Sequence, residues 1–280
     1  MLLSVFLREG ARRLEALYPP GEARSLVERL SEDVCGFKPY DHIVQPSLEA
    51  PEVLVDALER LATGEPLQYV VGWTEFYERR FNVSPGVLIP RPETEQLVRE
   101  ACVRALQIES PRVLDLCTGS GCIAWSIALE VPEAGVLGVD VSEEALEVAL
   151  NQTPADSGHS DPEFVQADVL EEGTFPGGPF DIIVSNPPYI RESEKALMHP
   201  NVLEHEPELA LFVPDEDPLL FYRAIARIAV SSLAPGGWGM VEINEALGRE
   251  TAAVFEAAGL RKVQVFPDFF GKDRFVTFVL

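Results

Sequence analysis

The chain has 280 residues, of which 46% are hydrophobic and 24% charged, a composition typical of a globular protein with one large domain and one small one. The formal net charge of −24 at pH 7 disfavours a nucleic-acid-binding protein, because phosphates repel such a chain unless it carries a compact basic patch. Only short basic pairs such as Arg12–Arg13 occur, so the charge favours a basic protein partner, or serves solubility alone.

Membrane, metal and disulfide-rich classes are also disfavoured. No apolar run reaches the length needed to cross a bilayer, and the apolar start of the chain lacks the basic segment of a signal peptide. The four cysteines show neither paired zinc spacing nor a disulfide framework. We therefore expect a cytoplasmic protein with reduced thiols, no membrane association and no metal site.

Residues 1–75 are predicted to form a small helical bundle. Apolar residues at helical spacing indicate one helix that ends before Tyr18, a second over residues 21–35 and a third over residues 48–61. A glycine and a proline follow the third helix, as is common after helix C-termini.

Residues 76–92 change character and are predicted to form a β-hairpin linker. Short β-type pieces, the last of them at residues 87–89, are separated by a basic pair and a Ser-Pro-Gly turn. The prolines at positions 90 and 92 end this segment, and Glu93 and the residues after it open a helix.

Residues 93–280 alternate apolar runs with helical patterns, which predicts an α/β fold with a doubly wound, mostly parallel seven-stranded sheet. The strands are expected at residues 113–116, 136–140, 164–168, 182–184, 239–243, 263–266 and 275–279. The last two must form an antiparallel hairpin, because their connection is too short for a parallel crossover.

A glycine loop joins the first of these strands to its helix. Its sequence is Asp115-Leu116-Cys117-Thr118-Gly119-Ser120-Gly121. Glycines allow the backbone to approach a ligand closely, and the helix that follows offers free N–H groups to an anion. Asp140 ends the next strand, where an acid commonly accepts ribose hydroxyls, and Asp168 ends the third, where it can accept from an adenine amino group.

The fourth strand is followed by Asn186-Pro187-Pro188-Tyr189. Residues that precede proline are restricted to extended backbone, so this turn is stiff. The Asn186 amide oxygen and the Pro187 carbonyl offer two acceptors to a planar NH2 group, with the Tyr189 ring as one wall. Such a turn suits a methyl acceptor, and together with Asp168 and the terminal hairpin it favours S-adenosylmethionine over NAD.

Several longer runs make the sequence recognisable. They are Gly64-Glu65-Pro66-Leu67-Gln68-Tyr69, Ile89-Pro90-Arg91-Pro92-Glu93-Thr94-Glu95, the glycine loop, the Asn-Pro-Pro-Tyr turn, Glu206-Pro207-Glu208-Leu209-Ala210-Leu211 and Asp273-Arg274-Phe275. With these the chain resembles, over nearly its whole length, the release factor glutamine methyltransferases of the PrmC/HemK family. These enzymes use S-adenosylmethionine to methylate the glutamine amide in the Gly-Gly-Gln motif of peptide chain release factors.

The resemblance implies roles for individual residues. Cys117, Thr118, Gly119, Ser120 and Gly121 match the cofactor loop. Asp140 matches the acid on the ribose, Asp168 and Val169 match the adenine side, and Asn186 contacts both cofactor and substrate. Asn186, Pro187, Pro188 and Tyr189 match the substrate turn, with Asn186, Pro187 and Tyr189 as catalytic residues. The resemblance further implies that the helical region recognises the release factor, and we expect a monomer that binds no nucleic acid directly.

Two positions depart from the family pattern. Cys117 stands where glycine is usual, so a side chain lies beside the point of close approach. Val169 stands where a bulkier residue is common, which predicts a looser adenine pocket.

Other functions remain open at this point. Two alternatives keep the methyl-transfer chemistry and change the acceptor: a glutamine of a ribosomal protein, or an adenine amino group of DNA. The DNA alternative needs a basic recognition region, and none is evident. Outside it are an NAD-dependent oxidoreductase with the same glycine loop, and a non-catalytic module that docks a basic protein.

Overall fold

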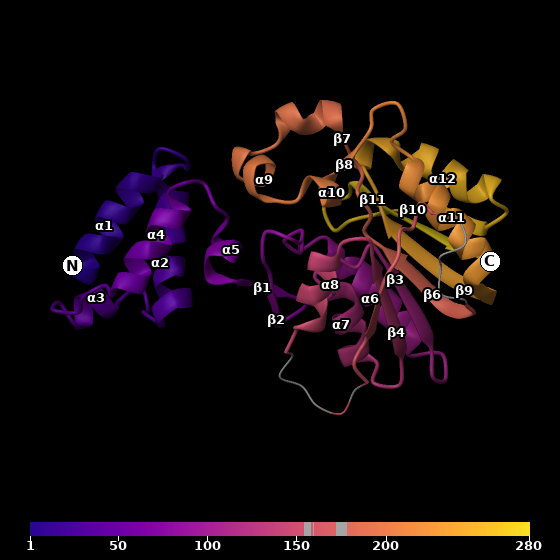
Figure 1. Cartoon of the computed structure of the whole chain (residues 1–280), viewed down its shortest axis with the longest axis horizontal. Coiled ribbons are helices and arrows are strands. Elements are labelled where there is room, and N and C mark those ends of the chain that lie inside the picture. The colour runs from indigo at the N-terminus through magenta and orange to yellow at the C-terminus, as the bar shows by residue number, and fades with distance from the viewer. Residues whose placement is uncertain (154–157, 159, 172–177) are drawn as a thin grey trace. The chain divides into compact units, whose positions relative to one another are not determined.

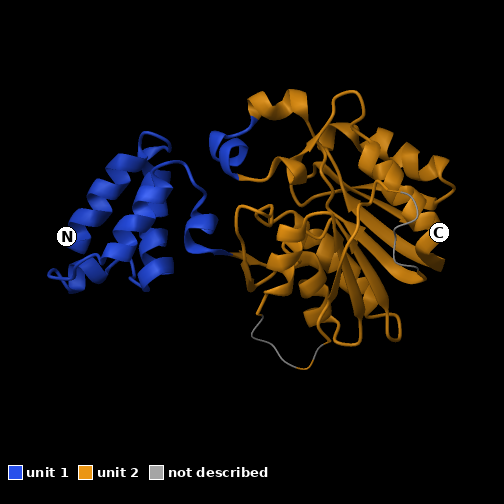
Figure 2. Ribbon diagram, viewed as in Figure 1, with its two compact units in different colours: residues 1–73, 198–205 blue, residues 74–197, 206–280 orange. Residues whose placement is uncertain are grey.

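The computed structural model describes residues 1–153, 158, 160–171 and 178–280. The chain divides into two compact units, Met1–Trp73 with Met198–His205, and Thr74–Leu197 with Glu206–Leu280 (Figure 2). The return of the chain to the first unit at residues 198–205 was not predicted from the sequence.

The first unit is helical. Its helices are α1 (Leu3–Leu14), α2 (Pro20–Cys35), α3 (Asp41–Val44), α4 (Glu52–Leu61), α5 (Leu67–Val71) and α9 (Pro200–His205). Their apolar faces form one core around fully buried residues such as Phe6 and Leu54. The helix predicted over residues 48–61 is α4, and it begins only at Glu52. Ala50 precedes Pro51, and a residue before proline disfavours helical backbone angles.

A two-stranded hairpin follows, with β1 (Trp73–Phe76) and β2 (Arg79–Asn82). Tyr77 and Glu78 form its turn with φ angles of 50° and 61°, the left-handed backbone that a tight hairpin needs. The first strand of the hairpin begins at residue 73, three residues before the predicted start of the linker at residue 76. Residues 83–92, expected to include a strand at 87–89, form a loop instead. The amide of Val87 donates to the carbonyl of Ser84 at 3.0 Å, and the amide of Ile89 donates to the side chain of Glu206 at 3.1 Å, so both are committed to partners outside a sheet.

The second unit contains the seven-stranded sheet, which confirms the predicted fold class. Its strands are β3 (Arg112–Leu116), β4 (Gly135–Asp140), β5 (Glu163–Gln166), β6 (Phe180–Ser185), β9 (Leu233–Glu242), β10 (Arg261–Pro267) and β11 (Asp273–Val279). They are ordered β10-β11-β9-β6-β3-β4-β5, and β11 runs antiparallel to both of its neighbours.

Helices cover both faces of the sheet (Figure 1). One face carries α6 (Thr94–Ala105), α7 (Cys122–Glu130) and α8 (Glu143–Leu150), and the other carries α11 (Leu220–Ser232) and α12 (Gly248–Ala257). Each layer closes its own apolar core against the strands. No helix in the described part of the chain is both long and apolar enough to cross a membrane.

The segment between β6 and α11 contains elements that the sequence did not predict. They are β7 (Ile190–Arg191), η1 (Glu192–Leu197), α9, α10 (Glu208–Leu211) and β8 (Phe212–Val213), and a short η2 (Glu245–Leu247) follows β9. β7 and β8 pair in parallel, so the two ends of this segment lie side by side.

The order of the strands places a site. From β3 the chain proceeds outward to β4 and β5, and then returns to the other side of β3 to form β6 and β9. In open α/β sheets, ligands bind at the carboxyl ends of the strands at such a switch point. Here Cys117 directly follows β3 and Asn186 directly follows β6.

Candidate active site

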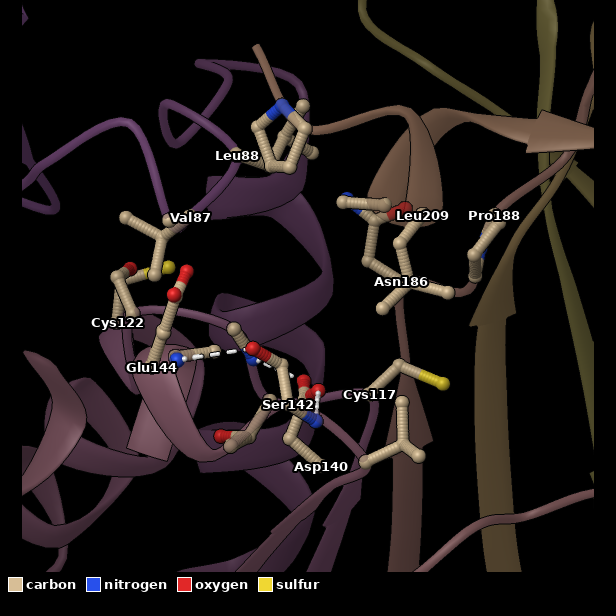
Figure 3. A pocket seen from close by; sticks show the side chains of 18 of the residues that line it. Val87, Leu88, Cys117, Cys122, Asp140, Ser142, Glu144, Asn186, Pro188 and Leu209 are labelled. Atoms are coloured by element: carbon tan, nitrogen blue, oxygen red, sulfur yellow. Dashed lines mark hydrogen bonds between the residues drawn. The ribbon is translucent and has the colours of Figure 1, made fainter. Parts of the chain in front are cut away.

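A cavity of about 400 Å³ lies at this switch point, within the size range of small-molecule sites. The loops after β3, β4, β5 and β6 line it, together with residues 85–88, 90–91 and 207–210. Figure 3 shows Asn186, Pro188 and Leu209 along one side and Val87, Cys122 and Glu144 along the opposite side.

Most of the predicted site residues meet in this cavity. The lining includes Cys117, Thr118, Gly119, Ser120, Asp140, Asp168, Val169, Asn186 and Pro188. Three predicted residues, all in the described part of the chain, fall outside the lining: Gly121, Pro187 and Tyr189. Each of these three lies next in sequence to a residue that lines the cavity.

The two glycines of the loop have different roles. Gly119 has a φ of +56° and open space where a Cβ would point, so it leaves room for a ligand. Gly121 has a φ of +77°, and a Cβ there would lie 2.9 Å from the Cβ of Ala149 and 3.1 Å from Phe164. Gly121 is therefore a packing residue that lets α7 start close to α8 and β5.

Cys117 adopts a backbone conformation that glycine tolerates better than other residues. Its φ is 59°, in the left-handed region that L-residues rarely occupy. Its side chain lines the cavity and packs against the core, where burial raises the pKa of the thiol well above its usual value. The chain thus carries a strained backbone residue in the wall of the cavity.

Backbone amides hold the carboxylates of the cavity in place. Asp140 accepts from the amide of Gly119 at 2.8 Å and from that of Ser142 at 3.0 Å, while burial raises its pKa. Asp168 accepts from the amide of Leu170 at 2.8 Å. Both side chains are thus oriented before a ligand arrives, and each carboxylate keeps lone pairs for further donors.

Asp115 lies beneath the loop and is fully buried. Its Oδ2 accepts the Thr118 hydroxyl at 2.5 Å, and its Oδ1 has no hydrogen-bond partner among the described residues. Burial, with a smaller contribution from Asp140, raises its pKa to about 7. The sequence showed this acid at the start of the loop, but its burial follows only from the packing of α7 over β3.

An ion pair joins two walls of the cavity. Arg91 donates to Glu206 at 2.7 Å, and the second carboxylate oxygen of Glu206 accepts the amide of Ile89 at 3.1 Å. Glu206 is almost completely buried, whereas Arg91 lines the cavity. Two sequence runs that lie far apart in the chain are thereby fastened together.

The turn after β6 splits its side chains between cavity and core. Asn186 and Pro188 line the cavity. The ring of Tyr189, expected as one wall of an amide site, packs against the core on the α11 side of the sheet. Its hydroxyl donates to Glu242 at 3.0 Å.

Sequence reasoning did not single out Thr94 or Glu242, although Thr94 lies between Glu93 and Glu95 in one of the motif runs. Glu95 accepts the amide of Tyr77 at 3.0 Å and so fixes the hairpin turn. Thr94 lines the cavity, and Glu242 is the last residue of β9. A signal was present, because a glutamate that ends an otherwise apolar strand needs a partner.

Comparisons with known proteins place the chain in a family. Residues 97–206 match the methyltransferase small domain and residues 6–72 match the PrmC N-terminal domain. A release factor glutamine methyltransferase of Bacteroides thetaiotaomicron is 43% identical over 98% of both chains, and one of Flavobacterium psychrophilum is 38% identical over 99% of this chain and 98% of the relative. The chain belongs to the release factor glutamine methyltransferase family.

The fold of this family member is shared more widely. A methyltransferase of Pyrococcus furiosus has a TM-score of 0.53 at 17% identity, over 80% of this chain and 98% of that one. Membership in the release factor glutamine methyltransferases confirms the resemblance inferred from the sequence and makes the chain an enzyme. The oxidoreductase and the non-catalytic docking module are thereby set aside.

Proposed function

We propose that this chain transfers the methyl group of S-adenosylmethionine to the side-chain amide nitrogen of the glutamine in the Gly-Gly-Gln motif of peptide chain release factors. One observation carries the proposal: the amide of Asn186 lines the same cavity as the glycine loop and the acids Asp140 and Asp168. These are the groups that the proposal assigns to the cofactor and to the acceptor amide, and they line one space. The names of the relatives supply the identity of the acceptor protein.

The residues present fit the cofactor. Gly119 leaves open space beside the loop, and the oriented carboxylate of Asp140 would accept the ribose hydroxyls. Asp168 would accept from the adenine amino group, with Val169 against the ring. When bound, the cofactor supplies a methyl group already activated by its sulfonium, so the chain needs to contribute position and exclusion of water.

Asn186 and Pro187 would act on the acceptor. The Asn186 oxygen and the Pro187 carbonyl would each accept one N–H of the glutamine amide, which leaves the nitrogen lone pair facing the methyl group. The same two acceptors stabilise the positive charge that develops on those N–H groups during transfer. The prolines at 187 and 188 stiffen the backbone that carries both acceptors.

The test is a methylation assay with purified release factor and labelled S-adenosylmethionine, followed by mass spectrometry of the product. We expect one methyl group on the glutamine of the Gly-Gly-Gln motif. Label on a ribosomal protein or on DNA, with none on the release factor, would replace the proposed acceptor.

We further propose that the first unit contributes to recognition of the release factor and that the enzyme acts as a monomer. The match of residues 6–72 to the PrmC N-terminal domain supports the first point. The second is the expectation formed from the sequence. Methylation of a short Gly-Gly-Gln peptide should show a much higher KM than that of the whole release factor, and equal KM values would exclude a second contact.

A further inference from the structure

Four side chains form a series of hydrogen bonds that runs from the cavity into the core: Asn186 and Thr94 line the cavity, and Glu242 and Tyr189 lie behind them. Ser185 and Val241 are opposite each other in the pairing of β6 with β9, so Asn186 and Glu242 follow in adjacent positions. Thr94, the first residue of α6, lies between their side chains. Its hydroxyl donates to Glu242 Oε2 at 2.7 Å, and Asn186 Nδ2 donates to Thr94 Oγ1 at 3.3 Å.

The chemistry of a hydroxyl decides which group donates and which accepts in each of these hydrogen bonds. A threonine hydroxyl has one hydrogen and two lone pairs, and a carboxylate only accepts. Because the hydrogen of Thr94 is committed to Glu242, Thr94 can only accept from Asn186. The NH2 group of Asn186 must therefore face Thr94, and its Oδ1 must face away.

A second arm fixes the carboxylate itself. Tyr189 donates its hydroxyl to Glu242 Oε1 at 3.0 Å, so each oxygen of Glu242 accepts one hydroxyl hydrogen. Glu242 is 1% exposed, so bulk solvent does not compete for these lone pairs. Burial raises the pKa of Glu242, but the hydrogen bonds from Thr94 and Tyr189, with the nearby charge of Arg274, oppose that rise.

We propose that Glu242 is a positioning residue that sets the rotational state of the Asn186 carboxamide through the Thr94 hydroxyl. An asparagine can present either its oxygen or its NH2 group to a ligand, and only the oxygen can accept an N–H of a glutamine amide. Glu242 selects the oxygen. The inference rests on the proposed function for its consequence in turnover, and on the geometry alone for the orientation of Asn186.

The first test removes the central hydroxyl. Thr94→Val keeps the shape of the side chain, and we expect its kcat for methyl transfer to fall at least about tenfold, while calorimetry shows cofactor affinity within about threefold of the unsubstituted enzyme. Thr94→Ser restores a hydroxyl and should turn over at least about fivefold faster than Thr94→Val. Thr251→Val is a matched control, since Thr251 is equally buried in α12 and its hydroxyl has no partner among the described residues. Equal kcat values for the Val and Ser variants at position 94 would overturn the proposal.

The second test reverses the donor and acceptor roles along this series of hydrogen bonds. Asn186→Asp places an acceptor against the Thr94 lone pairs and should lose most activity. Adding Glu242→Gln lets the new amide donate to Thr94 while its oxygen still accepts from Tyr189. In this double variant the Thr94 hydroxyl is free to donate to the carboxylate introduced at position 186, whose second oxygen remains for the substrate. The double variant should be at least about threefold more active than Asn186→Asp alone, and no recovery would contradict the proposed direction.

The third test needs no turnover. In a nuclear Overhauser spectrum of the full chain, the side-chain NH2 protons of Asn186 should show cross-peaks to the Thr94 methyl group. If the unsubstituted enzyme failed to methylate glutamine but showed these cross-peaks, the proposed function would fail and the orientation would stand. Absence of the cross-peaks in an enzyme that does methylate glutamine would overturn the orientation alone.

Discussion

Arg91 and Glu206 are 115 residues apart in the sequence, yet their side chains meet at 2.7 Å and fasten the loop before α6 to the segment before α10. Both segments line the cavity. The buried carboxylate of Glu206 also holds the amide of Ile89, so one side chain secures the loop at two points.

Replacing Glu206 by Gln should therefore lower both stability and cofactor affinity. Loss of the charge leaves Arg91 without its partner, and we expect a decrease of about 1–3 kcal/mol in the free energy of unfolding, below the usual range for buried pairs because Arg91 is partly exposed. Urea unfolding and calorimetric titration with S-adenosylmethionine measure the two effects. Asp217→Asn, which breaks the exposed pair with Arg223, is the control and should cost less than about 1 kcal/mol. Equal costs in the two variants would show that the Glu206 pair does not secure the loop.

Replacing Asn186 by Ala should reduce turnover far more than cofactor binding. The side chain is expected to hold the acceptor amide, and loss of one such transition-state contact lowers kcat by about a hundredfold. The dissociation constant for S-adenosylmethionine should change by no more than about threefold, because the carboxylates and the glycine loop remain. Comparable losses in both quantities would make Asn186 a structural residue.

Replacing Cys117 by Gly should leave stability within about 1 kcal/mol of the original, because relief of the left-handed strain offsets lost packing and the greater freedom of the unfolded chain. Cys117→Val should be clearly destabilising, since a β-branched residue is least tolerated at positive φ. The same change to glycine at Cys122, the buried first residue of α7, provides the contrast, since it removes packing with no left-handed strain to relieve, and should cost about 1 kcal/mol or more. Thermal unfolding of the three variants decides between these effects, and a strongly destabilised Cys117→Gly would show that packing dominates strain.

Asp115 should make the protein less stable as the pH rises. Its pKa is about 7 in the folded chain and near 3.8 when unfolded, so between these values the folded state holds the proton more tightly. Its contribution to stability is fully present below the unfolded pKa of about 3.8 and is lost as the pH approaches about 7. The stability of the unsubstituted chain relative to Asp115→Asn should therefore fall across this interval and level off above it.

Asp268 supplies the opposite case. Burial acts to raise its pKa, but the amides of Lys272 and Phe270 and the side chain of Arg274 outweigh it and lower the pKa. Relative to Asp268→Asn, the unsubstituted chain should lose stability as the pH falls towards the acid range. Urea unfolding across the pH range measures both effects. If the free energy of unfolding of Asp115→Asn and that of Asp268→Asn depended on pH in the same way, both assignments would be contradicted.

The features predicted most accurately were those that depend on local pattern. The apolar runs and their spacing placed all seven strands of the large sheet, and the short link before Asp273 required the antiparallel hairpin. The glycine loop and Asn186 were found because their residue types are unusual after a strand. The helix predicted at 48–61 began late because Pro51 restricts the residue before it. Residues 87–89 formed no strand because the amide of Ile89 donates to Glu206, a distant partner that the local pattern does not show.

The parts that escaped prediction depend on long-range packing. Glu242 and Thr94 are 148 residues apart, and nothing in the local pattern of either indicates that they share a hydrogen bond. The return of residues 198–205 to the first unit has the same origin, since it is stabilised by contacts such as the stacking of His199 on Tyr18. The position of the Tyr189 side chain also depended on its partner in β9.

The switch point between β3 and β6 separates the acids of the cavity from its amide. Asp140 and Asp168 lie on the β4 and β5 side, and Asn186 and Glu242 lie on the β6 and β9 side. Under the proposed roles, a substitution in β6, β9 or the loops after them would alter the acceptor site and leave the opposite side of the cavity intact. Preference among acceptors could thus evolve here separately from binding of the methyl donor.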